Sequence, residues 1–322
     1  MTCLLITAGA IIVLLALLNL KTSRPDGKLI SKYDMHAYRT MLGYIMPTRN
    51  ESVVYFDSFV RAEALLDYIE QARKHHEVGI IHCIMAAITS ASERNPKMNT
   101  FISGRRLYQR NNWYVSFSMK RKKLNKEAKV SAVKLKLNDA ESFNELVERM
   151  NGDIKVERSD AETYADKETG LLIKLPRPIL RFACGLVRWA DYYNILPKSF
   201  IDGDAFYSTV VCANLGSVGM GAAFHHLYEW GNCPLFLMVG KIEDRPVVEN
   251  GVVVAGKVLH LRYSYDERID DGLTSRYGID AVKNSLEHPF ETFGCVEDDK
   301  SDVHTLDGWD GIELPDASPP AK

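Results

Sequence analysis

A continuous apolar run opens the chain, from Cys3 to Leu20, and it contains no charged residue. As a helix, this run of about 18 residues would be roughly 27 Å long, close to the thickness of a bilayer's hydrocarbon core. A cleaved signal peptide is the alternative, but it would need a basic residue before the run and a small-residue cleavage site after it. We therefore predict one transmembrane helix. By the positive-inside rule, the basic residues that follow it place the rest of the chain in the cytoplasm: Lys21, Arg24, Lys28 and Lys32.

Beyond residue 29 the apolar positions alternate between helical and strand spacing, which predicts a mixed α/β domain. Asn250-Gly251 is typical of a two-residue hairpin turn. The second half of the domain is predicted to be mostly sheet. We expect helices over 62–75, 78–90 and 140–151, and strands over 108–118, 130–137, 207–215, 235–241, 246–248, 252–254 and 258–265.

A second unusual segment, 176–193, combines large apolar residues with three arginines: Arg177, Arg181 and Arg188. Such a helix fits the interface of a bilayer, with Trp189 at the depth of the headgroups. It fits equally well as a helix docked on the protein core, with the arginine side chains reaching out to water. The pattern does not decide between the two.

Composition changes suggest three regions: an anchor and linker over 1–28, a folded domain over 29–290 and an acidic tail over 291–322. The breaker cluster Ser23–Gly27 is expected to be a short linker. The tail is rich in acidic residues and is expected to be disordered. We also expect a solvated basic turn over 120–129 and a mobile polar segment over 153–169.

The charge and cysteine content exclude several functions. The formal net charge is −2, and basic residues do not interleave with aromatic ones, so we expect no nucleic-acid binding. The six cysteines form no CxxC pair and no cluster with zinc spacing, so we expect no metal. Their apolar surroundings suggest reduced core residues, in keeping with the cytoplasm.

Several motifs recur in an order that is known from one superfamily. Asp266–Gly272, after a predicted strand, resembles a D-H-R-x-x-D-G signature, and Ala213–Gly219 resembles S-N-L-G-x-x-G. The strand-turn-strand pieces 236–241 and 245–251 lie between them, and Asn95–Asn99 contains a P-x-x-N that closes a helix. Over roughly residues 30–290, the chain resembles the catalytic domain of the 2-oxo acid dehydrogenase E2 acyltransferases and chloramphenicol acetyltransferase.

This resemblance implies an α/β fold, a chloramphenicol-acetyltransferase-like two-layer sandwich with a large mixed β-sheet, preceded here by the transmembrane helix. It also implies a homotrimer with its active site at the subunit boundary. There a His removes a proton from a thiol or hydroxyl, a coenzyme A thioester supplies the acyl group, and a Ser or Thr donates to the oxyanion.

The chain departs from the family at both chemical positions: Glu267 stands in place of the His, and Ala213 in place of the Ser. Asp271 and Gly272 match, but that Asp is mainly structural in the family. Proton transfer from a thiol is uphill by about 2 pKa units to His and about 4 to Glu. The difference is about 3 kcal/mol. Glu267 is therefore either a weakened base or a carboxylate that forms an ion pair or faces solvent.

Phe224–Gly231 places His225 and His226 beside Glu229, near the expected acyl channel. One of them could replace the lost base, with Glu229 orienting its ring. A shared metal is disfavoured, because adjacent side chains of an extended segment point to opposite faces. The weaker candidates for the oxyanion and substrate contacts are Asn214, Ser208, Ser217 and Asp271. We interpret His82 and His260 as structural.

The glycines within 216–221 do not follow the order of a phosphate-binding loop, so we attribute them to a close backbone approach in a tight turn.

The functional hypothesis is an acyltransferase at the cytoplasmic membrane face, with membrane lipid around residues 3–20 and a small-molecule acyl acceptor. The alternative is a catalytically inactive trimeric scaffold on the same fold.

Overall fold

The computed structural model describes residues 2–120, 130–138, 141–158, 170 and 173–294. Its centre is a six-stranded mixed sheet in the order β2-β9-β8-β7-β5-β6. β7 runs parallel to β5 and β8, and every other neighbouring pair is antiparallel. The strands are β2 (Val53–Arg61), β5 (Tyr114–Lys120), β6 (Val130–Lys136), β7 (Val210–Asn214), β8 (Leu235–Glu249) and β9 (Val252–Asp266). The predicted large mixed sheet is confirmed.

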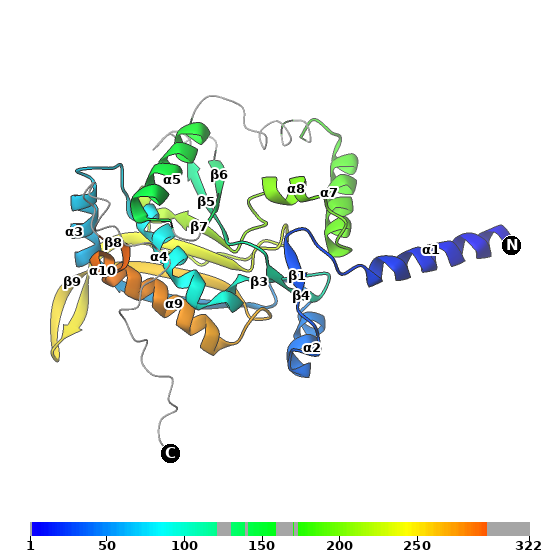
Figure 1. The fold of residues 1–322 in the computed structure, drawn as a ribbon, viewed down its shortest axis with the longest axis horizontal. Coiled ribbons are helices and arrows are strands. Elements are labelled where there is room, and N and C mark those ends of the chain that lie inside the picture. Colours follow the sequence, from blue (N-terminus) through cyan, green and yellow to red (C-terminus); the bar gives the residue numbers. More distant parts are fainter. Residues whose placement is uncertain (1, 121–129, 139–140, 159–169, 171–172, 295–322) are drawn as a thin grey trace, which may run out of the picture.

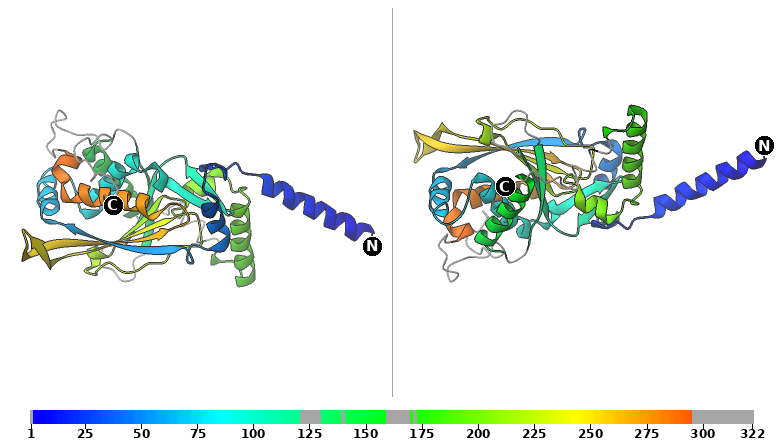
Figure 2. Two further views of the ribbon diagram at one scale, coloured as in Figure 1. Left: turned by 90° about the horizontal axis from the view of Figure 1, so that it is seen from below. Right: turned by 90° about the horizontal axis from the view of Figure 1, so that it is seen from above.

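Helices cover one face of this sheet and enclose the main hydrophobic core (Figures 1 and 2). They include the three helices that the apolar spacing predicted, with α5 longer than expected because it continues through Arg158. The predicted mobile segment is therefore helical over 153–158, and its remainder, 159–169, lies outside the described residues, as does 121–129 of the basic turn. The covering helices are α3 (Glu63–Ala72), α4 (Ile80–Arg94), α5 (Phe143–Arg158), α9 (Gly272–Glu287) and α10 (Pro289–Phe293).

β8 and β9 are single long strands where the pattern predicted four short ones. The predicted turn joins them: Asn250 and Gly251 have φ angles of 50° and 82°. Two consecutive positive φ values are what a type I′ turn requires, and this explains the Asn-Gly pair. The resulting hairpin extends from one end of the molecule (Figure 2).

A three-stranded sheet, β1-β4-β3, lies beside the large one. Its strands are β1 (Gly27–Leu29), β3 (Thr100–Ser103) and β4 (Arg106–Arg110). The single strand predicted over 108–118 is wrong, since this stretch is divided between β4 and β5, which belong to different sheets. The two parts bond to different partners: β4 pairs with β1 up to the Asn111 amide, which donates to the carbonyl of Asp26 at 3.1 Å, whereas β5 pairs with β6 and β7.

The predicted linker is part of the folded domain. Arg24 and Asp26 are buried, with a hydrogen bond of 2.9 Å between Arg24 Nε and Asp26 Oδ1. At the other end, the fold continues past the predicted boundary at 290 into α10, where Phe293 is fully buried. The rest of the predicted tail, 295–322, lies outside the described residues.

The apolar N-terminal run forms helix α1 (Thr2–Leu20), which projects from the domain (Figure 1). Within the described part of the chain, no helix is both long and apolar enough to cross a membrane, so the predicted transmembrane span is not found. Among the described residues, the other helical elements are α2 (Ala37–Ile45), α7 (Arg177–Tyr192), α8 (Lys198–Gly203) and the 3-10 turns η1 (Pro96–Asn99) and η2 (Leu215–Val218).

Candidate active site

The turn between β9 and α9 is held by a buried ion pair. The Asp266 carboxylate accepts from Arg268 Nε at 2.8 Å and Arg268 Nη2 at 2.6 Å, and from Ser52 Oγ at 2.9 Å. Arg268 also donates from Nη1 to the carbonyl of Met46 at 2.8 Å. Glu267 lies between the two paired residues and is exposed, while its backbone N–H donates to the Ser52 carbonyl at 3.0 Å. The turn is thus rigid, and Glu267 presents its carboxylate outward.

Asp271 caps helix α9. Its Oδ1 accepts from the Thr274 amide at 2.9 Å, and this bond holds the pKa of Asp271 below its ordinary value. Arg39 Nη2 lies 3.9 Å from Asp271 Oδ2. Within one chain, the Asp271 carboxylate is therefore used to cap the N-terminus of α9, which is a structural role.

Asp270 was not among the candidates, although it is buried directly beside this turn. Its Oδ1 accepts from the Asp271 amide at 2.8 Å, whereas Oδ2 has no hydrogen-bond partner among the described residues. Burial raises the pKa of Asp270. The hydroxyl of Tyr265 and Nη1 of Arg39 are likewise buried without partners in the described part of the chain.

His225 and His226 lie in an irregular segment that follows the open face of the sheet. Ser264 Oγ donates to the carbonyl of His225. The His225 ring stacks on Phe236, with the ring centroids 3.9 Å apart, and on His226, with the centroids 4.8 Å apart. The expectation that the two side chains point to opposite faces is therefore wrong, because the segment is not a strand.

The hydrogen bonds of both rings decide which nitrogen carries the proton. His225 Nδ1 lies 2.6 Å from the carbonyl of His226, and His226 Nδ1 lies 3.0 Å from the carbonyl of Leu227. A carbonyl oxygen can only accept, so each Nδ1 must donate, and in the neutral form of a ring the lone pair then lies on Nε2. Burial lowers the pKa of His225, which favours its neutral form. His225 thus has the tautomer of a general base.

Glu229 does not orient either imidazole. Its Oε1 accepts from the Asn50 amide at 3.0 Å and from Asn50 Nδ2 at 2.9 Å, which ties the segment to the residues just before β2. His225 and Glu267 nevertheless belong to the same end of the sheet. Ser264, which holds His225, precedes Glu267 by three residues, or roughly 10 Å of strand.

The Asn214 turn has its own internal bonds. Asn214 Oδ1 accepts from the Ser217 amide at 3.0 Å, and Ser217 Oγ donates to the Asn214 carbonyl at 2.7 Å. A Cβ on Gly216 would lie 2.4 Å from the carbonyl oxygen of Gly240, so the turn packs directly on β8. This close contact confirms the backbone-approach interpretation for Gly216, whereas a Cβ on Gly219 or Gly221 would meet nothing within 4 Å.

One chain does not bring the two motifs together. Asn214 pairs with Val239, which pairs with Leu261, and Leu261 precedes Glu267 by six residues, or roughly 20 Å. Ser208 is also fully buried, and its hydroxyl donates to the carbonyls of Ala205 at 2.9 Å and Val210 at 3.3 Å. The hydroxyls of Ser208 and Ser217 are therefore both committed to backbone carbonyls.

The two histidines that we interpreted as structural, His82 and His260, both have partners. His82 Nδ1 accepts from the Gly79 amide at 3.1 Å and its Nε2 lies 3.2 Å from Asn151 Oδ1, while burial lowers its pKa. His260 Nε2 lies 2.7 Å from Asp57 Oδ1. In the part of the chain that the structure describes, no three His, Cys, Asp or Glu side chains are placed to hold a metal ion.

Comparison with known proteins gives a partial sequence match. Residues 203–293 match the family of 2-oxoacid dehydrogenases acyltransferase (catalytic domain). The dihydrolipoyllysine-residue acetyltransferase components of the pyruvate dehydrogenase complex of Staphylococcus aureus and Staphylococcus epidermidis are 30% identical over 132 residues, 39% of this chain. The chain spans only 29% of the length of these curated relatives.

Solved structures extend the similarity to most of the chain. A probable dihydrolipoamide acetyltransferase from Listeria monocytogenes has a TM-score of 0.51 at 16% identity, covering 82% of this chain and 95% of its own. The cubic core of the pyruvate dehydrogenase multienzyme complex has a TM-score of 0.51 at 13% identity, covering 84% and 93%. A chloramphenicol acetyltransferase has a TM-score of 0.50 at 12% identity, covering 81% and 99%. The chain therefore has the fold of the chloramphenicol and dihydrolipoamide acetyltransferases, with sequence similarity to the 2-oxoacid dehydrogenase acyltransferase catalytic domain over residues 203–293.

Proposed function

We propose that this protein is an acyltransferase that moves an acyl group between coenzyme A, or another thioester, and a small acceptor at the cytoplasmic face of a membrane. The fold and the match over 203–293 support this class of reaction. The observation that most supports this proposal is the hydrogen bond of the His225 ring. Its Nδ1 donates to the His226 carbonyl at 2.6 Å, so Nε2 is free to accept a proton at the end of the sheet that also bears Glu267.

In this mechanism, His225 replaces the family's missing base. Nε2 takes the proton of the attacking thiol or hydroxyl, whose sulfur or oxygen then bonds to the thioester carbonyl carbon. The tetrahedral intermediate collapses by breaking the carbon–sulfur bond, and the departing thiolate recovers the proton from the imidazolium. For a thiol of ordinary pKa, transfer to an ordinary imidazole is uphill by about 2 units, against about 4 for a Glu. Glu267 is the rival base in the same region.

Asn214 and Glu267 are separated by roughly 20 Å in one chain. An active site that contains both residues must therefore lie between two subunits. We propose a homotrimer in which the Asn214 turn of one subunit faces the Glu267 end of the next. Asn214 Oδ1 caps η2, but Nδ2 has no partner among the described residues. Nδ2 is therefore the side-chain donor left for an oxyanion, since the Ser208 and Ser217 hydroxyls already donate to carbonyls.

A second candidate function is an inactive trimeric scaffold. It is favoured by Ala213 at the position of the family's Ser and by the commitment of both nearby serine hydroxyls. The two functions share the fold and the assembly. They differ in whether the full chain turns over a thioester.

A kinetic comparison tests the proposal. The detergent-solubilised full chain is incubated with labelled acetyl-coenzyme A and a panel of thiol and hydroxyl acceptors that includes dihydrolipoamide. We expect His225→Gln to lower kcat by about 10²- to 10⁴-fold, the usual contribution of a general base. His226→Gln and Glu267→Gln should have smaller effects. His75→Gln, at an exposed position beyond α3, is the matched control and should have none.

Two results would contradict this assignment. If Glu267→Gln abolishes turnover and His225→Gln leaves it intact, Glu267 is the base. If the wild-type chain transfers no acyl group to any acceptor, the scaffold function stands.

A further inference from the structure

Helix α7 presents two apolar faces, of which only one packs on the domain. On the inner face, Val187 and Ala190 contact the small core cluster of Leu196, Ile201 and Tyr207. On the outer face, four large side chains recur at spacings of three and four residues. Their exposed fractions are 52% for Ile179, 72% for Phe182, 51% for Leu186 and 39% for Trp189. The outer face is thus an apolar stripe that the described part of the chain leaves uncovered.

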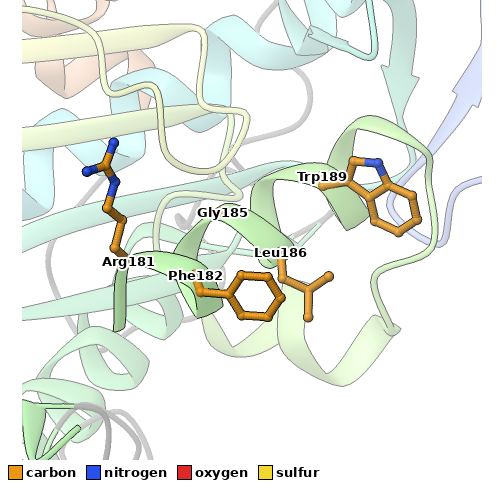
Figure 3. A pocket seen from close by; sticks show the side chains of 5 residues that line it. All are labelled: Arg181, Phe182, Gly185, Leu186 and Trp189. Carbon is orange, nitrogen blue, oxygen red and sulfur yellow. The ribbon is translucent and has the colours of Figure 1, made fainter. Parts of the chain in front are cut away.

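Arg181 borders this stripe on one side. Phe182, Leu186 and Trp189 line a shallow open depression together with Gly185 and Arg181, and Arg181 points away from the apolar side chains (Figure 3). Arg177, Arg181 and Arg188 are exposed, and none of them has an ion pair among the described residues. An apolar face with the unpaired Arg181 at its edge, on a helix whose polar side carries Arg177 and Arg188, complements a surface of acyl chains below anionic headgroups.

Helix α1 lies at the same end of the molecule as α7 (Figure 2). Its described side chains are almost all exposed, and they include leucines, isoleucines and a valine along its whole length. The apolar stripe of α7 is therefore not isolated. It lies near a second exposed apolar helix of the same chain.

A buried network fixes the ends of both helices to the domain. Asn194, just after α7, donates to the carbonyl of Lys21, just after α1, at 2.9 Å. Arg24 Nη2 donates to Asp191 Oδ1 at 3.0 Å and Arg24 Nε to Asp26 Oδ1 at 2.9 Å. Burial alone would lower the pKa of Arg24, but these two carboxylates raise it above its ordinary value. The charged Arg24 thus ties the C-terminal end of α7 to the segment that follows α1.

We propose that the outer face of α7 docks on an anionic lipid bilayer, beside α1 in the same membrane. Phe182, Leu186 and Trp189 enter the boundary between headgroups and acyl chains, and Arg181 at the edge of the stripe reaches lipid phosphates. Continuity with α1 and the unpaired positive charge favour a lipid surface over a protein partner. The proposal rests on the membrane location in the proposed function but not on its chemistry, so acyl transfer in detergent tests the function separately.

Trp189 fluorescence in vesicles tests this docking. The full chain is reconstituted into phosphatidylglycerol–phosphatidylcholine vesicles that contain lipids brominated close to the headgroup, and Trp189→Phe defines the contribution of Trp189. We expect the Trp189 emission to shift to shorter wavelength and to be quenched by the brominated lipid. Phe182→Asp with Leu186→Asp should abolish this quenching. Vesicles of phosphatidylcholine alone should give weaker quenching.

A matched control comes from the tip of the β8–β9 hairpin, where Val248 and Val252 are 70% and 62% exposed. Val248→Asp with Val252→Asp introduces the same charge away from α7 and should leave the quenching unchanged. The proposal is overturned if vesicle-bound protein keeps Trp189 accessible to iodide and insensitive to brominated lipid. It is also overturned if cysteines placed at Phe182 cross-link two copies and exclude lipid, because the occupant would then be a second chain.

Discussion

Removing Arg268 should destabilise the protein strongly, although this residue contacts no substrate in the proposed mechanism. Arg268→Met deletes the two bonds to Asp266, at 2.8 and 2.6 Å, and the bond to the Met46 carbonyl at 2.8 Å. Asp266 is fully buried and would keep only the Ser52 hydroxyl at 2.9 Å and the Arg268 amide at 3.1 Å.

The magnitude follows from the charge that is left behind. Removing one partner of a buried ion pair costs about 3–5 kcal/mol, because the other charge stays uncompensated. The two hydrogen bonds that Asp266 keeps place the loss near the lower limit, at about 3 kcal/mol. For a domain of this size the midpoint of thermal unfolding should fall by roughly 6–12 °C. Adding Asp266→Asn removes the charge and should recover about half of the loss or more.

The assay is urea unfolding of the wild type, both single variants and the double variant, followed by tryptophan fluorescence. The four free energies of unfolding form a double-mutant cycle. A loss below about 1 kcal/mol for Arg268→Met, or a double variant less stable than Arg268→Met alone, would refute the reasoning. Either result would mean that the pair does not hold the turn that presents Glu267.

Three further changes have predicted outcomes. Burial lowers the pKa of His82, so the unfolded chain binds a proton at a higher pH than the folded chain does. The free energy of unfolding should therefore fall as the pH drops below about 6.5, and His82→Gln should reduce this fall when urea unfolding at pH 7.5 and 5.5 is compared. Burial lowers the pKa of Lys134 to about 8, so stability should rise between about pH 8 and pH 10 more steeply in the wild type than in Lys134→Met. Gly216→Ala should cost about 1–3 kcal/mol by thermal unfolding, because its Cβ would meet the Gly240 carbonyl at 2.4 Å, whereas Gly221→Ala has open space and should cost much less.

Local patterns predicted the parts of the fold that are stabilised locally. Apolar spacing identified α3, α4 and α5, and Asn250-Gly251 identified the β8–β9 hairpin, whose turn needs two positive φ angles. The order of the motifs between Asn214 and Gly272 indicated the superfamily fold, because these motifs mark strand ends and turns.

Contacts between distant residues explain what the sequence did not predict. The stretch 108–118 alternates throughout, but the Asn111 amide bonds to Asp26 and the strand divides there. The sequence around Arg24 is typical of a linker. Arg24 is nevertheless buried, because it bonds to Asp191, Asn194 and Ser103, which are far from it in the sequence.

The candidate site was predicted only in part, for a similar reason. The importance of His225 followed from its neighbours in sequence, but its tautomer depends on a local carbonyl and its stacking on Phe236, in β8. The distance between Asn214 and Glu267 depends on the sheet register, which no motif spacing reveals. The buried state of Asp270 depends on the packing around the β9–α9 turn.

The measurement that tests the central claim most directly is a structure of the full chain, in its solution assembly, with coenzyme A bound. The account predicts a trimer in which the thiol lies within hydrogen-bonding reach of His225 Nε2, close to Glu267 and to Asn214 Nδ2 of the adjacent subunit. Coenzyme A bound at another surface, or a monomer that binds none at millimolar concentration, would contradict the acyl-transfer account.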